Sequence, residues 1–307
     1  MTEAPPTEIP DFWPCTHGPR LPRIALMGEF SAGKSTLVNL MVGANPLPVQ
    51  VVATQLPPVW MAYGSQPSVI VDLAGNEVPC RLDELNGMSL DDVAFIKFYC
   101  EEEILKRCEL IDMPGISDPN MASIIWERMM PFADGVVWCS PATQAWRQSE
   151  AAVWEGVEAK VQANSILLLT RADMLLTARD KARVITRVKS EADAAFRDIL
   201  MMSLTQARDA MDNEELWHES GADDFVLAFL SLVEGLASSL EDARVERSDT
   251  VLETPRAASI DGECATGHVS ADAIVPRRPK LRRSVKVERP ASEASTAQSL
   301  AFMPKFS

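Results

Sequence analysis

The chain has 307 residues, of which 47% are hydrophobic and 24% are charged, and its formal net charge is −15. These proportions are ordinary for a globular protein, and the length allows one large domain or two small ones. The acidic balance argues against general binding to nucleic acid, because phosphates would be repelled by the surface as a whole.

The six cysteines are scattered without the spacing of a zinc site, which indicates free thiols in a reducing compartment. The first 25 residues are acidic and rich in proline, and they contain no apolar segment typical of a secretory signal. No stretch approaches the roughly 18 apolar residues that span a bilayer. We therefore expect a cytoplasmic protein, with any membrane contact being peripheral and at the inner face of the membrane.

The sequence predicts three regions. Residues 1–20 form an extended arm, because closely spaced prolines prevent a continuous helix. Residues 21–245 form one α/β domain in which short apolar runs alternate with longer periodic ones. Residues 246–307 lack periodic apolar positions and are rich in Ser, Ala, Pro and charge, so we expect a disordered tail with a basic segment at 275–289.

Within the domain, strands are expected at 23–28, 59–64, 68–73, 94–100, 108–114, 135–140, 165–170 and 199–204. Helices are expected at 34–43, 120–131, 147–162, 179–197 and 222–242. Strands that are apolar throughout indicate burial on both faces, and their alternation with helices favours a mostly parallel sheet between two helical layers. No helix separates the strands between 59 and 100, which predicts an antiparallel extension at one edge.

The last predicted helix carries apolar residues at helical spacing. These residues are Phe225, Phe229, Val233, Leu236 and Leu240. The stripe either packs on the sheet or offers a docking surface for another helix.

The turn after the first strand carries the pattern G-x-x-x-x-G-K-[ST]. Its residues are Gly28, Glu29, Phe30, Ser31, Ala32, Gly33, Lys34 and Ser35, followed by Thr36. Glycines let successive backbone N–H groups point at one anion, and the positive end of the next helix faces the same phosphates. Lys34 supplies a cation to the outer phosphates, and the Ser35 hydroxyl suits Mg²⁺. A glycine-rich turn without a ligand is the alternative.

Two further motifs identify the nucleotide. The sequence DMPG runs from Asp112 to Gly115, where an aspartate can hold the Mg²⁺ shell through water and the glycine N–H can meet a γ-phosphate. The sequence TRAD begins at Thr170, and its Asp173 can accept two hydrogen bonds from guanine while Arg171 lies over the base. Each aspartate alone could be a helix cap, but three motifs in this order predict a site for GTP and GDP.

Two loops complete the predicted site. Thr54 is the only threonine between Thr36 and Thr143, which makes it the candidate to close over Mg²⁺ and the γ-phosphate. A plain turn hydroxyl is the alternative reading. The loop after the last predicted strand should supply another guanine contact, and Ser203 with Leu204 is the nearest match to the usual Ser-Ala pair.

These motifs resemble the GTPase domain of bacterial dynamin-like proteins. The resemblance rests on "GEFSAGKSTLVNLMVG", on Thr54 ahead of "PPVWMAYG", on "LIDMPGISDPN" and on "TRADML", and it covers roughly 21–245. It implies a three-layer P-loop GTPase domain that hydrolyses GTP with Mg²⁺. In that family the residue matching Ser31 helps arrange the catalytic water and a monovalent cation across a dimer of G domains. Ser31 is therefore a candidate catalytic residue beside Lys34, Thr54 and Gly115.

The chain also departs from related enzymes. Phe30 stands where eukaryotic dynamins have glutamine, and Ile116 follows Gly115 where Ras-type enzymes place a glutamine. No arginine finger can be assigned, so we expect slow hydrolysis that accelerates on nucleotide-dependent homodimerisation or with a partner. Family members continue into a helical stalk, whereas the sequence of this chain predicts a minimal G domain that works with a separate partner.

Three alternatives stay open for the tail, whose basic segment can bind anionic lipid headgroups, can dock on a protein or on the G domain, or has no specific role. Two alternatives stay open for the function. One is a GTP-dependent switch or scaffold without its own catalysis, and the other is a ribosome-associated GTPase of the Era type. The Era type predicts an RNA-binding module, which this sequence does not supply.

Overall fold

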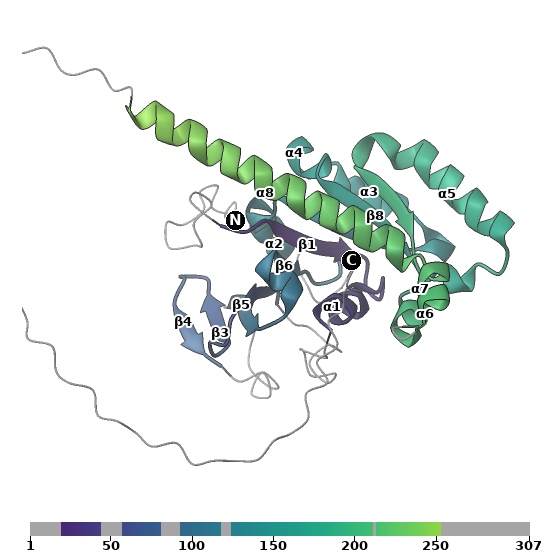
Figure 1. Cartoon of the computed structure of the whole chain (residues 1–307), viewed down its shortest axis with the longest axis horizontal. Helices are drawn as coiled ribbons and strands as arrows, with labels where there is room; N and C mark the ends of the chain where they lie inside the picture. Colours follow the sequence, from purple (N-terminus) through teal and green to yellow (C-terminus); the bar gives the residue numbers. More distant parts are fainter. Residues whose placement is uncertain (1–19, 44–56, 81–92, 118–123, 211–212, 253–307) are drawn as a thin grey trace, which may run out of the picture.

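The computed structural model describes residues 20–43, 57–80, 93–117, 124–210 and 213–252 (Figure 1). Within these ranges the strands are β1 (Arg23–Gly28), β2 (Val59–Tyr63), β3 (Val69–Asp72), β4 (Glu77–Pro79), β5 (Val93–Cys100), β6 (Glu109–Asp112), β7 (Gly135–Pro141), β8 (Ser165–Thr170) and β9 (Asp198–Met201). The α-helices are α1 (Lys34–Val42), α2 (Ile124–Met129), α3 (Gln148–Trp154), α4 (Ala159–Gln162), α5 (Ala178–Ala192), α6 (Leu204–Asp209), α7 (Glu214–Glu219) and α8 (Ala222–Leu252).

The described strands form one sheet in the order β4-β3-β5-β2-β6-β1-β7-β8-β9. From β6 to β9 all neighbours are parallel, as the alternation of apolar runs and helices predicts. Every residue of β1 and β8 is buried, because helices cover both faces of this half of the sheet. The carboxyl ends of β1, β6, β7, β8 and β9 therefore meet at one edge.

The predicted extension is confirmed, although one of its pairings is parallel. β2 runs antiparallel to β6, and β3 runs antiparallel to both β4 and β5. β2 and β5 pair in parallel, and β5 lies between β2 and β3 in the sheet. The edge strand β4 was missed by the sequence reading, since its three residues are all exposed and show no buried face.

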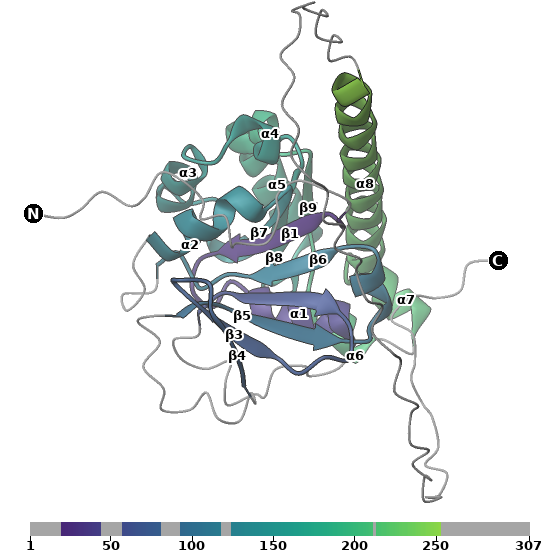
Figure 2. The ribbon, with the colours of Figure 1, turned by 90° about the vertical axis from the view of Figure 1, so that its left-hand side faces the viewer.

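The two faces of the sheet carry separate apolar clusters, which confirms the three-layer arrangement. In β1, Ile24 and Leu26 pack in the cluster with residues of α1 and α8. Ala25 and Met27 pack in the other cluster, with residues of α2, α3 and α5. Figure 2 shows α8 on one side of the sheet and α2, α3 and α4 on the other.

Several helix bounds differ from those predicted. The helix expected at 147–162 is two helices, α3 and α4, and the expected strand 199–204 stops at Met201. It stops there because Ser203 caps α6, with its Oγ accepting a hydrogen bond from Gln206 N. Neither α6 nor α7 was expected. α8 runs beyond the predicted 222–242 to Leu252, so the expectation of disorder from residue 246 is wrong for 246–252. The rest of the predicted tail, and the predicted arm up to residue 19, lie outside the described residues.

The apolar stripe of α8 packs on the sheet. Phe225, Phe229, Val233 and Leu236 are buried in the cluster with α1, whereas Leu240 is half-buried. Figures 1 and 2 show the C-terminal part of α8 projecting beyond the sheet. Among the helices of the described ranges, none has a stretch sufficiently long and apolar for a bilayer crossing.

Candidate nucleotide site

The turn from β1 into α1 is shaped by two glycines with positive φ. Gly28 has φ 136°, and a Cβ atom there would lie 2.0 Å from the carbonyl oxygen of Cys139 on β7. Gly33 has φ 98° and takes the N-cap position of α1 without a side-chain hydrogen bond. The turn thus passes close to β7, and α1 begins directly after it, so that the positive end of this helix dipole lies at the loop.

The side chain of Lys34 lies inside this turn. It is buried, and its Nζ donates to the carbonyl oxygens of Gly28, at 3.1 Å, and Glu29, at 2.9 Å. A buried ammonium needs several acceptors, and phosphate oxygens are stronger acceptors than neutral carbonyls. This places a fixed positive charge within the loop that the sequence identifies as a phosphate cradle.

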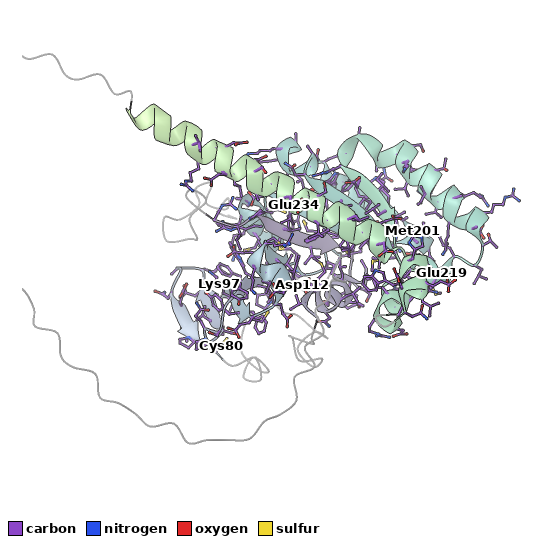
Figure 3. The ribbon with its side chains drawn as sticks, in the orientation of Figure 1. Cys80, Lys97, Asp112, Met201, Glu219 and Glu234 are labelled. Carbon is purple, nitrogen blue, oxygen red and sulfur yellow. The ribbon has the colours of Figure 1, made fainter. Side chains whose placement is uncertain are left out.

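Ser35, in the first turn of α1, meets Asp112, the last residue of β6. Figure 3 labels Asp112 within the molecule. Ser35 Oγ lies 3.5 Å from Asp112 Oδ2. Burial raises the pKa of Asp112 to about 6, although the positive charge of Lys34 and the Ser35 hydroxyl act in the opposite direction. Asp112 Oδ1 is buried, and among the described residues it has no hydrogen-bond partner. An unsatisfied carboxylate oxygen beside a hydroxyl fits the predicted Mg²⁺ shell.

The DMPG segment packs tightly on the phosphate loop. A Cβ atom on Gly115 would lie 2.8 Å from both N and Cα of Phe30, so only glycine fits this approach. Ile116 N donates to the Gly28 carbonyl at 3.2 Å, and Phe30 N donates to Ser117 Oγ at 3.2 Å. The structure therefore brings Gly115 to the loop, as the sequence predicts, while the Phe30 ring remains 58% exposed.

The TRAD segment is bonded to the same loop. Thr170 Oγ1 donates to the Ala32 carbonyl at 2.7 Å, and Arg171 Nη2 donates to the Ser31 carbonyl at 2.6 Å. Ser31 and Arg171 both have left-handed backbone conformations, with φ 58° and 56°. Arg171 thus supports the loop, and its predicted position over the base stays a prediction.

Asp173 and Ser203 are also brought together. Ser203 Oγ donates to Asp173 Oδ1 at 2.6 Å, although the two residues are 30 positions apart. Ser203 is fully buried, and its Oγ also caps α6. The structure thus places Ser203 beside the predicted guanine reader, and its predicted contact with guanine stays a prediction. Thr36 lies in the first turn of α1, and Thr54 lies outside the described residues.

One contact of the loop was not found in the sequence. The carboxylate of Glu29 accepts a hydrogen bond from Arg147 Nη1 and one from Ser149 Oγ, each at 2.8 Å. Arg147 precedes α3, and 118 residues separate it from Glu29. No local spacing can indicate such a pair, because it depends on the parallel pairing of β1 with β7.

Known proteins resemble this chain over the region that includes the phosphate loop. Residues 24–172 match the sequence model of the dynamin family. Dynamin-like protein 2 of Campylobacter jejuni subsp. jejuni serotype O:23/36 (strain 81-176) is 24% identical over 201 residues, which cover 62% of this chain and 32% of that protein.

A solved structure shows the same fold. It is described as an oligomerised bacterial dynamin pair that provides a mechanism for the long-range sensing and tethering of membranes. It matches with a TM-score of 0.52 at 18% identity, and the match covers 76% of this chain and 37% of that chain. The matches thus span only about a third of the length of these two relatives.

Proposed function

We propose that this chain contains a dynamin-like G domain, which binds GTP with Mg²⁺ and hydrolyses it to GDP and phosphate. One observation carries the proposal: the buried Lys34 ammonium lies across a loop that also meets Asp112, Gly115 and the TRAD segment. All of these groups lie at the carboxyl edge of the parallel strands, where nucleotides bind in folds of this class.

The residues divide the work as follows. Lys34 and the N–H groups at the start of α1 hold the phosphates, and Asp173, oriented by Ser203, accepts hydrogen bonds from guanine. Ser35 and Thr54 would hold Mg²⁺ directly and Asp112 would hold it through water. When bound, this ion neutralises charge that develops on the phosphate oxygens.

Hydrolysis requires a water molecule positioned at the γ-phosphate. Gly115 offers its N–H beside the loop, and Ser31 is the candidate to arrange the water with a monovalent cation. No glutamine follows Gly115, so we propose a slow intrinsic rate that rises when two G domains meet. The oligomerised pair described for the structural relative supports self-association.

The cellular setting is part of the same proposal. We place the protein in the cytoplasm, with peripheral attachment to the inner face of the membrane as one use of the basic segment 275–289. The membrane tethering described for the structural relative supports this use. Docking of the same segment on a protein partner is the alternative.

The test is GTP turnover per protein molecule over a wide range of protein concentration. Lys34→Ala serves as the blank, and Lys160→Ala, an exposed lysine on α4, is the matched control. A specific rate that climbs with concentration and is lost in the blank supports catalysis between G domains. A flat, low rate above the blank indicates a switch that awaits an activator. Equal rates in wild type and blank would refute hydrolysis.

A further inference from the structure

The Glu29 carboxylate is an unusual group to find in a loop that binds a polyanion. Its side chain is only 12% exposed, and both of its oxygens are occupied by donors from the segment that precedes and begins α3. The backbone carbonyl of the same residue accepts from Lys34 Nζ. Glu29 therefore joins the phosphate loop to Arg147 and Ser149.

The segment that carries Arg147 is built rigidly. Glu150 is fully buried, and its Oε2 accepts from Arg147 N and from Ser140 Oγ, both at 2.9 Å. The Ser140 hydroxyl in turn accepts from Trp146 N at 3.0 Å, and Trp146 has φ 55°. These hydrogen bonds fix the backbone at Arg147, so its guanidinium is presented to Glu29 rather than left to sample solvent.

A nucleoside triphosphate brings several negative charges to this loop. Without a compensating cation, the partly buried Glu29 carboxylate would repel the charged phosphates. Lys34 alone would then have to offset both the carboxylate and the phosphates. Arg147 supplies the missing charge at 2.8 Å. The exposed fraction of its side chain is 45%, so this compensation should weaken in salt.

We propose that Arg147 is a positioning residue that neutralises Glu29 and thereby lets the phosphate loop accept a nucleoside polyphosphate. The inference rests on the proposed function, because it concerns the same site. Arg147 acts through Glu29, so it is distinct from a finger that touches the transferred phosphate. Ser149 contributes the second hydrogen bond and no charge, so its effect should be smaller.

The experiment is a double-mutant cycle on the affinity of the full chain for a fluorescent GTP analogue that is not hydrolysed. We expect Arg147→Ala to weaken binding about tenfold at low salt in the wild-type background. In a Glu29→Gln background, the same substitution should cost less than about twofold, because no charge remains to be neutralised. The tenfold loss should shrink between about 50 mM and 300 mM salt, and Arg147→Lys should recover part of it.

Arg183→Ala is the matched control, because it removes one exposed arginine from α5 and should leave affinity unchanged. Circular dichroism and urea midpoints show whether each variant is folded. An equal loss in both backgrounds, or a loss that salt does not reduce, would overturn the proposal in favour of a structural role. Wild-type protein that binds no GTP analogue would refute the proposed function itself, and the inference with it.

Discussion

Glu150 is the buried carboxylate beneath the nucleotide site, and Glu150→Gln tests how strongly it organises the start of α3. Its Oε1 accepts from Trp138 Nε1 at 2.8 Å, and its Oε2 accepts from Ser140 Oγ and Arg147 N. A glutamine side chain keeps one acceptor oxygen and replaces the other with an NH₂ donor. If the oxygen serves Ser140 and Arg147, the NH₂ group meets the indole N–H of Trp138. The indole N–H then loses its acceptor and the new NH₂ group finds none there, so two buried donors stand without an acceptor.

Each buried donor without an acceptor costs about 1–3 kcal/mol, and removal of a buried charge offsets part of that cost. We therefore expect Glu150→Gln to lower the free energy of unfolding by about 2–4 kcal/mol at pH 7. Urea unfolding followed by tryptophan fluorescence measures this change, with an unaltered m-value as evidence that the folded state is intact. Glu155→Gln, at an exposed position just after α3, is the control and should change stability by less than about 0.5 kcal/mol.

The pH dependence of this difference has a definite sign. Burial raises the pKa of Glu150, opposed by its hydrogen bonds from Trp138, Arg147 and Ser140. The folded protein therefore holds this proton to a higher pH than the unfolded chain does. The stabilising contribution is fully present below the ordinary carboxyl pKa of 4.5 and is lost as the pH rises through the raised value. Glutamine does not titrate, so the gap between wild type and variant should narrow as the pH rises from about 4.5 to 8. A gap that widens, or a variant as stable as wild type, would refute the reasoning.

Two further substitutions test the loop and the base site. Gly28→Ala should lower the free energy of unfolding by about 3 kcal/mol or more and abolish nucleotide binding, because its Cβ would overlap the Cys139 carbonyl at a φ of 136°. Urea unfolding and a nucleotide titration measure both effects, and wild-type affinity would contradict them. Ser203→Ala should weaken GDP binding about fivefold, because Asp173 loses the donor that orients it. A competition titration measures this loss against Ser238→Ala, an exposed serine on α8, and equal affinities would show that Asp173 needs no such support.

The sequence reveals those parts of the site that depend on neighbours in the chain. The phosphate loop follows a buried strand and precedes a helix, so glycine spacing and apolar pattern together locate Gly28, Lys34 and Ser35. Asp112 and Asp173 follow other buried strands, and parallel pairing brings all of these ends to one edge. Only the order of the elements along the chain is needed for this inference.

Other features depend on contacts between residues that lie far apart in the sequence. The extension strands offered apolar runs but no information on register, so the parallel pairing of β2 with β5 could not be read from them. The strand expected at 199–204 ends early because Ser203 caps α6. Its position in an apolar run indicates a strand residue, but its hydroxyl bonds to the backbone of the helix instead. Glu29 and Arg147 likewise meet only after β1 and β7 have paired.

Hydrogen bonds of the phosphate loop connect the predicted phosphate site with the predicted base site. Thr170 and Arg171, which precede the predicted guanine reader Asp173, donate to the carbonyls of Ala32 and Ser31. Arg147 holds the Glu29 side chain. Three residues of the phosphate loop are therefore held by the end of β8 and by the segments that follow β7 and β8. A shift of either segment would break or lengthen these hydrogen bonds to the phosphate loop. In the proposed GTP site, a base that displaces Arg171 would therefore also break its hydrogen bond to the Ser31 carbonyl in the phosphate loop.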